Sequence, residues 1–194
     1  IVAADVDNGS SDICGIASMT VLPNTFDCTN EGANTVTLTV TDNNGNSNTC
    51  TSTVTVEDNT LPTAVCQDIT VQLDATGNAS ILASDVDNGS SDICGTTSMT
   101  VTPNTFDCTN VGANAVTLTV TDNNGNISNC NATVTVEDNI LPNVVCQDIT
   151  VQLDATGNAS IVAADIDNGS TDICGIASMT VSPNAFDCTN VGAN

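Results

Sequence analysis

The feature that most constrains this chain is an internal repeat with a period of about 80 residues. The run IVAADVDNGSSDICG begins at Ile1, and close copies of it begin at Ile81 and Ile161. Residues 1–34 and 161–194 are identical at 29 of 34 positions, with no insertion between the copies. A period of this kind predicts a string of similar folding units rather than one large core. A unit of about 80 residues is long enough for a small domain, but its core is thin.

Each unit carries the pattern of β-strands. Val36, Leu38 and Val40 alternate with threonines, and the same alternation recurs at 54–56. Alternation with a period of two predicts strands with one buried face and one solvated face. Turn sequences rich in Asp, Asn and Gly, such as DATGN at 74–78, separate these strands. Short strands at such regular spacing indicate an all-β sandwich.

The repeat divides naturally at its Leu-Pro steps, because proline stops the strand before it. Cuts near residues 60 and 140 give a partial sandwich at 1–59 that lacks its opening strands, a complete one at 60–139, and a partial one at 140–194 that lacks its closing strands. In the complete repeat we expect strands at 64–73, 79–86, 97–103, 115–121 and 128–137.

The charge pattern excludes several classes of partner. The chain has 23 Asp and Glu and no Lys, Arg or His, so its formal net charge is −23. Nothing can neutralise the phosphates of nucleic acid or the surface of an anionic membrane. No apolar run approaches the roughly 20 residues of a membrane span. Because no carboxylate can find a cationic side chain, hard divalent cations that prefer oxygen ligands are the expected partners.

The same composition argues against catalysis. Without His, Lys, Arg or Tyr, only carboxylates, hydroxyls and thiols remain for acid–base chemistry. A glycosidase with paired carboxylates would also need aromatic platforms for its sugar, and the three aromatic residues are all Phe. We therefore predict that the protein is not an enzyme.

Ten cysteines recur in phase, four to each complete repeat. A zinc site would call for histidines or a CxxC spacing, and the sequence has neither. Regular, even-numbered cysteines in a small repeated domain are typical of disulfides, which form in oxidising compartments. The prediction is an exported, extracellular protein.

The repeat resembles a known family. In the complete copy the carrying residues are Leu61-Pro62, Cys66, the VDNGS loop, Phe106, GANAVTLTVTDNNGN, Cys130 and the exit VTVED. This pattern is similar to the hyalin-repeat (HYR) module, an immunoglobulin-like sandwich of extracellular and adhesive proteins that often occurs in tandem. The near-identical copies also resemble giant bacterial surface adhesins. The resemblance implies tandem immunoglobulin-like β-sandwich domains with an adhesive or scaffolding role, and the pair Cys94 and Cys108 is an addition to its pattern.

Two disulfide schemes are self-consistent. The resemblance, together with the usual adjacency of first and last strands, favours Cys66–Cys130 with a clip across a middle loop in each repeat. The other scheme pairs sequence neighbours throughout, including Cys50–Cys66 and Cys130–Cys146 across the joints. The favoured scheme consists of Cys66–Cys130, Cys94–Cys108, Cys14–Cys28 and Cys174–Cys188.

Acidic loops supply candidate metal ligands. The motif DxDNGSxD places oxygen side chains around a glycine turn, as loops that wrap calcium do. In a seven-strand sandwich, the loops at 85–92 and 122–126 lie at the same pole, and the incoming linker at 57–59 reaches it too. Three acidic segments then converge where one repeat meets the next, and we predict Ca²⁺ there. The predicted ligands are Glu57, Asp58, Asp85, Asp87, Asn88, Asp92 and Asp122 at the first joint, Glu137, Asp138, Asp165, Asp167 and Asp172 at the second, and Asp5, Asp7 and Asp12 in the first repeat.

These features favour a structural segment of an extracellular fibre or adhesin stalk. Its partners would be neighbouring repeats of the same chain, or end-to-end copies in a filament. The alternative is a calcium-dependent module that binds carbohydrate, for instance surface glycans. A sugar site usually stacks its ligand on Trp or Tyr, and the sequence contains neither.

Overall fold

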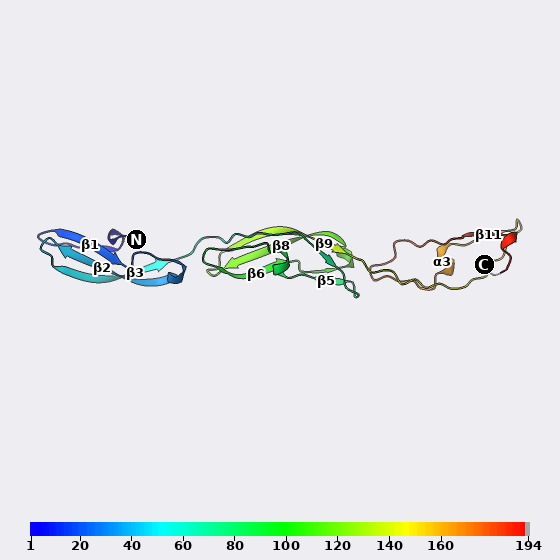
Figure 1. The fold of residues 1–194 in the computed structure, drawn as a ribbon, viewed down its shortest axis with the longest axis horizontal. Helices are drawn as coiled ribbons and strands as arrows, with labels where there is room; N and C mark the ends of the chain where they lie inside the picture. The colour runs from blue at the N-terminus through cyan, green and yellow to red at the C-terminus, as the bar shows by residue number, and fades with distance from the viewer. Residues whose placement is uncertain (193–194) are drawn as a thin grey trace. The chain divides into compact units, whose positions relative to one another are not determined.

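The computed structural model describes residues 1–192, apart from the side chain of Thr97, and most of its regular structure is β-strand (Figure 1). The strands are β1 Ile16–Leu22, β2 Gly32–Asp42, β3 Ser47–Val56, β4 Ile69–Gln72, β5 Asn78–Ser80, β6 Thr96–Thr102, β7 Thr105–Asp107, β8 Gly112–Asp122, β9 Ile127–Glu137, β10 Asn158–Ser160 and β11 Ala185–Asp187. Short helical turns lie between them: α1 Ala3–Val6, η1 Cys28–Asn30, α2 Ala83–Val86, η2 Cys108–Asn110, α3 Ala163–Ile166 and η3 Cys188–Asn190.

The middle repeat is an immunoglobulin-like sandwich. Its larger sheet has the order β4-β9-β8-β6, and β5 pairs with β7 in a second, two-stranded sheet. The first strand, β4, runs parallel to the last strand, β9, with Ile69 opposite Val134 and Val71 opposite Val136. Adjacent first and last strands bring the beginning and end of the repeat together, which is the arrangement assumed in favouring the Cys66–Cys130 pairing.

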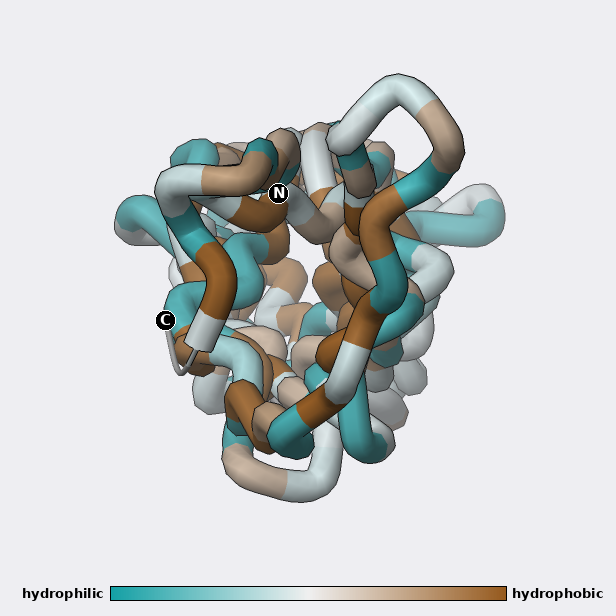
Figure 2. Tube along the Cα trace, turned by 90° about the vertical axis from the view of Figure 1, so that its right-hand side faces the viewer, coloured by the Kyte–Doolittle hydropathy of each residue, from teal (hydrophilic) through white to brown (hydrophobic). Residues whose placement is uncertain are grey.

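Alternation along the strands builds the core. Val116, Leu118 and Val120 of β8 are fully buried, as are Val134 and Val136 of β9. The threonines between them are only partly buried, so fully buried and partly buried positions alternate along both strands. In the part of the chain nearest the viewer in Figure 2, hydrophobic and hydrophilic residues also follow one another along the trace. The alternation of apolar residues and threonines in the sequence therefore corresponds to the alternation of buried and partly buried side chains in these strands.

The parallel strand β4 decides how well the neighbouring strand is covered. In the middle repeat, Val134 and Val136 lie beside β4 and are 0% and 1% exposed. Their counterparts in the first repeat, Val54 and Val56 of β3, are only half-buried. β3 pairs with β2 and has no parallel strand of its own within residues 1–192. Coverage by the first strand of the repeat thus completes this side of the core.

The strand expected at 79–86 is wrong beyond Ser80. Residues 83–86 form the helical turn α2, and Asp85 accepts a hydrogen bond from the backbone N–H of Leu82 at 2.7 Å. The first repeat has the same turn, with Asp5 accepting from Val2 at 2.7 Å. A carboxylate three residues after the start of a turn satisfies a backbone donor that a strand would have paired with its neighbour.

The chain forms two compact units. One comprises residues 1–64 together with 89–99 and 119–129, and the other comprises 65–88, 100–118 and the chain from 130 onward. The first unit thus unites the first repeat with two loop regions of the middle repeat. The boundaries near 60 and 140 remain a division of the sequence. Within residues 1–192, no helix is long and apolar enough to cross a membrane.

Candidate functional site

Three disulfides link the chain at nearly constant spacing. Cys66 is bonded to Cys130 within the middle repeat, with a sequence separation of 64 and a Cα–Cα distance of 5.9 Å. Closing a loop of this length stabilises a domain by about 4 kcal/mol in the chain-entropy treatment. The other two bridges, Cys28–Cys94 and Cys108–Cys174, have separations of 66 and each join one repeat to the next.

The middle-loop clip expected from the sequence is wrong. The structure does not pair Cys94 with Cys108, because the seven-residue strand β6 lies between them. A strand of that length spans about 23 Å, whereas bonded cysteines keep their Cα atoms within about 7 Å. Each repeat therefore presents one of these cysteines at either pole, where only a neighbouring repeat can reach it. The same holds for the expected pairs Cys14–Cys28 and Cys174–Cys188, since Cys28 and Cys174 are bonded elsewhere.

Four exposed cysteines form no disulfide: Cys14, Cys50, Cys146 and Cys188. Each occupies a repeat position that is bonded elsewhere in the chain. The period makes Cys14 equivalent to Cys94 and Cys188 equivalent to Cys108. Within residues 1–194, no cysteine lies at a spacing of 64 or 66 from any of these four. Their free state thus agrees with the pairing rule of the bonded cysteines.

Three carboxylates from separate segments meet at the first joint. Asp58 lies in the linker after β3, Asp92 in the turn before β6, and Asp122 at the end of β8. One carboxylate oxygen of each lies within 4.8 Å of the others. All three were among the ligands predicted from the sequence, and they come from the three segments expected to converge at this pole.

Asp122 is the most enclosed of the three, with 1% of its surface exposed. Its Oδ1 accepts hydrogen bonds from the backbone N–H groups of Asn124 at 2.9 Å and Asn126 at 2.8 Å, and its Oδ2 accepts one from the Asn126 side chain at 2.7 Å. Burial acts to raise the pKa of Asp122, but these hydrogen bonds outweigh it and leave the pKa below its ordinary value. The group is therefore a carboxylate at neutral pH.

Asp58 supplies an unsatisfied oxygen. Its Oδ1 accepts a hydrogen bond from the backbone N–H of Thr60 at 2.8 Å, and its backbone carbonyl accepts one from the Asn126 side chain at 3.0 Å. Its Oδ2 is buried and has no hydrogen-bond partner. A buried, unpaired carboxylate oxygen is costly unless a cation or donor faces it. The chain has no Lys, Arg or His, so none of its side chains can supply a positive charge to this oxygen.

The first repeat contains an internal reference for this arrangement. Asp42 is the counterpart of Asp122 and accepts the same three hydrogen bonds, from Asn44, Asn46 and the Asn46 side chain, each at 2.8 Å. It is nevertheless only half-buried. The turn itself therefore does not enclose Asp122. The linker carrying Asp58 does, through the hydrogen bond from Asn126.

A fourth acid at this joint was missed by the sequence reasoning. A carboxylate oxygen of Glu31 lies within 4.8 Å of one of Asp58. The Cys94 sulfur is equally close but is bonded to Cys28, so it cannot serve as a thiolate ligand. One signal was available in the sequence: the equivalent residues of the other repeats are Val111 and Val191.

Other predicted ligands have local roles. Asp7 and Asp167 accept hydrogen bonds from the glycine and serine that follow them, and Asp12 and Asp172 each accept one from the next cysteine. Asp165 accepts from Val162, as Asp85 does from Leu82. The N–H of Asn88 donates to the carbonyl of Val65. Glu57 is exposed. Within residues 1–192, no cluster of three possible metal ligands includes Glu57, Asp85 or Asp87.

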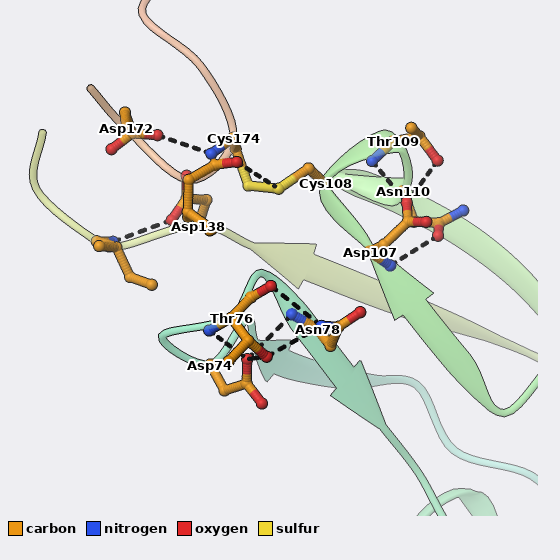
Figure 3. Close-up of a disulfide and its surroundings, with 12 residues drawn as sticks. Asp74, Thr76, Asn78, Asp107, Cys108, Thr109, Asn110, Asp138, Asp172 and Cys174 are labelled. Atoms are coloured by element: carbon orange, nitrogen blue, oxygen red, sulfur yellow. Dashed lines mark hydrogen bonds between the residues drawn. A yellow bond between two sulfur atoms is a disulfide. The ribbon is translucent and has the colours of Figure 1, made fainter. Parts of the chain in front are cut away.

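The second joint is not assembled in the same way. Asp138 accepts a hydrogen bond from Ile140 at 3.0 Å, and Asp172 accepts one from Cys174 at 2.9 Å, beside the Cys108–Cys174 bridge (Figure 3). Glu137 accepts one from Gln72 at 2.6 Å. Among the described residues these acids form no group of three. The counterpart of Asp122 would be residue 202, beyond Asn194.

Aspartates in the turns give the fold a predicted acid sensitivity. Asp27 is typical: the hydroxyl of Thr29 donates to its carboxylate at 2.6 Å and the Thr29 N–H at 2.9 Å, which lowers its pKa. Lowered pKa values recur at Asp7, Asp42, Asp74, Asp107, Asp122, Asp154, Asp167 and Asp187.

Below about pH 4, unfolded Asp takes up protons while these folded carboxylates stay ionised, so the unfolded state binds more protons. We expect the free energy of unfolding in chelator to stay level between about pH 7 and 5 and to fall below about pH 4. Denaturant titrations across this range test it. Stability that rises on acidification would show instead that relief of carboxylate repulsion dominates.

Comparisons with known proteins give a match to one family over part of the chain and a similarity to solved structures. Residues 7–56 match the HYR domain, an immunoglobulin-like extracellular repeat. No curated protein matches the chain. Among solved structures, it is similar to the extracellular cadherin domains 1–4 of protocadherin gamma B7, with 12% identity and a TM-score of 0.35 over 76% of this chain. The chain spans about half of that protein (48%). Residues 7–56 of this all-β chain thus match the HYR domain, and residues 87–136 repeat the same segment of the sequence.

Proposed function

We propose that this chain is a tension-bearing segment of an extracellular fibre or adhesin stalk, in which disulfides and a bound calcium ion hold neighbouring repeats together. The observation that carries the proposal is the joint itself. A buried, unpartnered oxygen of Asp58 lies in a group with Asp92 and Asp122, and two disulfides cross between repeats. The HYR domain at 7–56 supports an extracellular, adhesion-type setting.

Calcium suits the proposed site better than other common cations. Ca²⁺ accepts six to eight oxygen ligands at 2.3–2.6 Å, so ligand oxygens across the ion lie up to about 5 Å apart. The spacing of the three Asp oxygens, within 4.8 Å, is compatible with that shell. Mg²⁺ requires ligands at 2.0–2.1 Å in near-ideal octahedral order, and the buried Asp122 is tied to its turn by three hydrogen bonds. Asp58, Asp92 and Asp122 would hold the ion, with Glu31 at its edge.

The role follows from what such a joint does. Neutralising the carboxylates removes their repulsion and fixes the linker after β3 against the turns that precede β6 and follow β8. A chain without Lys or Arg also offers no cleavage site to trypsin-like proteases. Both properties serve a protein whose task is to keep its length and stiffness outside the cell.

The direct test is a calcium titration of the intact, oxidised chain by calorimetry, paired with thermal unfolding in chelator, Ca²⁺ and Mg²⁺. We expect one site with a Kd below about 1 mM, and stabilisation of about 2.7 kcal/mol when free Ca²⁺ is 100 times Kd. Mg²⁺ should restore little of it. Calcium binding no tighter than millimolar, or equal stabilisation by both ions, would contradict the proposed joint.

A further inference from the structure

One acidic residue at the first joint has no acidic counterpart in the other repeats. Glu31 directly follows the turn η1, whereas the repeat places Val111 and Val191 at the equivalent positions. A carboxylate oxygen of Glu31 lies within 4.8 Å of one of Asp58, although the chain has no cationic side chain to offset their repulsion. The first repeat thus contributes a carboxylate to its joint where the other repeats carry valine.

A disulfide fixes the position of Glu31. Cys28 begins η1, and its bond to Cys94 places the Cys94 sulfur within 4.8 Å of a carboxylate oxygen of Glu31. The turn itself is closed by a hydrogen bond from the backbone N–H of Asn30 to the carbonyl of Asp27 at 2.9 Å. Since Glu31 is the third residue after Cys28, the bond leaves its carboxylate little freedom to move away from Cys94.

The other end of this disulfide is tied to the acidic group. The backbone N–H of Cys94 donates a hydrogen bond to Oδ1 of Asp92 at 2.7 Å. The carbonyl of Cys94 accepts one from the side chain of Asn123 at 2.8 Å, and Asn123 directly follows Asp122. Cys94 is therefore connected to the turns of two of the three aspartates, and the bond to Cys28 connects both turns to the first repeat.

The three aspartates do not fill the ligand shell of a calcium ion. Ca²⁺ takes six to eight oxygen ligands, and its affinity rises with the charge of the ligand set. Both oxygens of Asp122 and one oxygen each of Asp58 and Asp92 already accept hydrogen bonds. The buried Oδ2 of Asp58 has no hydrogen-bond partner, which independently points to a cation at this place. A fourth carboxylate adds charge and up to two oxygens, and Glu31 is close enough to supply it.

We infer that the Cys28–Cys94 disulfide controls calcium binding at the first joint, because it delivers Glu31 from the preceding repeat as a fourth ligand. The inference rests on the proposed function and names the bond and the residue that regulate its calcium site. Without Glu31, the ion contacts only the linker and the middle repeat. With Glu31, the first repeat also holds the ion, so the covalent link and the metal link between repeats strengthen each other.

Calorimetric titration of the oxidised full chain with Ca²⁺ tests the ligand. Glu31→Val installs the residue of the other repeats at an exposed position, and we expect calcium affinity to fall at least about fivefold. Glu31→Gln keeps one ligand oxygen, so its affinity should lie between those of the parent and Glu31→Val. The matched control is Asp42→Asn, which removes a charge from the same repeat outside the acidic group and should leave the affinity unchanged.

A double-mutant cycle tests the delivery of Glu31 by the disulfide. Cys28→Ser with Cys94→Ser should weaken calcium binding by about as much as Glu31→Val, and combining all three changes should weaken it less than about twofold further. Cys108→Ser with Cys174→Ser removes the other bridge of the same sequence separation and should leave the affinity unchanged. Far-UV circular dichroism checks that each variant keeps its strands.

The outcomes separate this inference from the proposed function. Calcium that binds equally tightly with and without the Cys28–Cys94 bridge would overturn the inference and leave the calcium joint standing. Equal affinity in the parent chain and Glu31→Val, or fully additive losses in the cycle, would do the same. A parent chain that binds no calcium would overturn both, and this result is visible in the parent titration alone.

Discussion

Pulled from its two ends in the oxidised state, the chain is expected to reach about 200–220 Å, against about 640–690 Å once its disulfides are reduced. The oxidised length is short because tension takes the shortest covalent path. That path runs from Ile1 to Cys28, crosses to Cys94, follows the chain through β6 to Cys108, and crosses to Cys174 before it reaches Asn194. Only these three stretches carry the force, and the remainder, including most of each sandwich, stays outside the path.

The disulfide within the middle repeat and the disulfides between repeats are expected to affect the maximum extension under force very differently. The Cys66–Cys130 bridge lies on a longer parallel route, so Cys66→Ser with Cys130→Ser should leave the maximum oxidised extension unchanged. Cys28→Ser with Cys94→Ser should lengthen it by about 150–165 Å, because the shortest path must then detour through Cys66 and Cys130. Single-molecule force spectroscopy distinguishes the two. Equal extension in both variants, or before and after reduction, would contradict the pairing or the tensile role.

Calcium affinity is expected to fall by at least about tenfold in Asp122→Asn, while Asp42→Asn leaves it unchanged. Asparagine can still accept the two backbone hydrogen bonds of either turn, so both variants suffer the same local change. Only Asp122 lies in the group with Asp58 and Asp92. The two variants therefore separate loss of a ligand from damage to a turn. Calorimetric titration of both measures the difference, and equal losses would show that Asp122 acts only through its turn.

Asp58→Asn is expected to shift the melting temperature in opposite directions without and with calcium. In chelator the variant removes a buried, unpaired carboxylate oxygen and is expected to melt at a higher temperature than the parent chain. In saturating calcium it lacks a ligand and is expected to melt at a lower one. A variant that shifts the melting temperature in the same direction under both conditions would indicate that no ion is held there.

Much of this arrangement was readable in the sequence because it depends on local periodicity. The Val-Thr alternation of 115–121 and 128–137 predicted β8 and β9, since a period of two has one physical meaning in a strand. Strand order then placed the loop ends at one pole, and the convergence of Asp58, Asp92 and Asp122 followed from that topology. The proximity of first and last strands likewise accounts for the Cys66–Cys130 bridge.

Only the tertiary structure decided which cysteines pair and which of several similar aspartates lie in the acidic cluster. Cys94 and Cys108 are close along the chain, yet β6 holds them at opposite poles, so each bonds to a neighbouring repeat. Asp42 and Asp122 share a motif and their hydrogen bonds, yet only Asp122 is enclosed, because the linker with Asp58 reaches it. Asp85 carries a carboxylate of the kind that binds calcium, yet this carboxylate accepts a hydrogen bond from the backbone N–H of Leu82 at the start of α2. Periodicity specifies which residues form strands and which face they occupy, whereas pairing and burial depend on the distances that the folded strands impose.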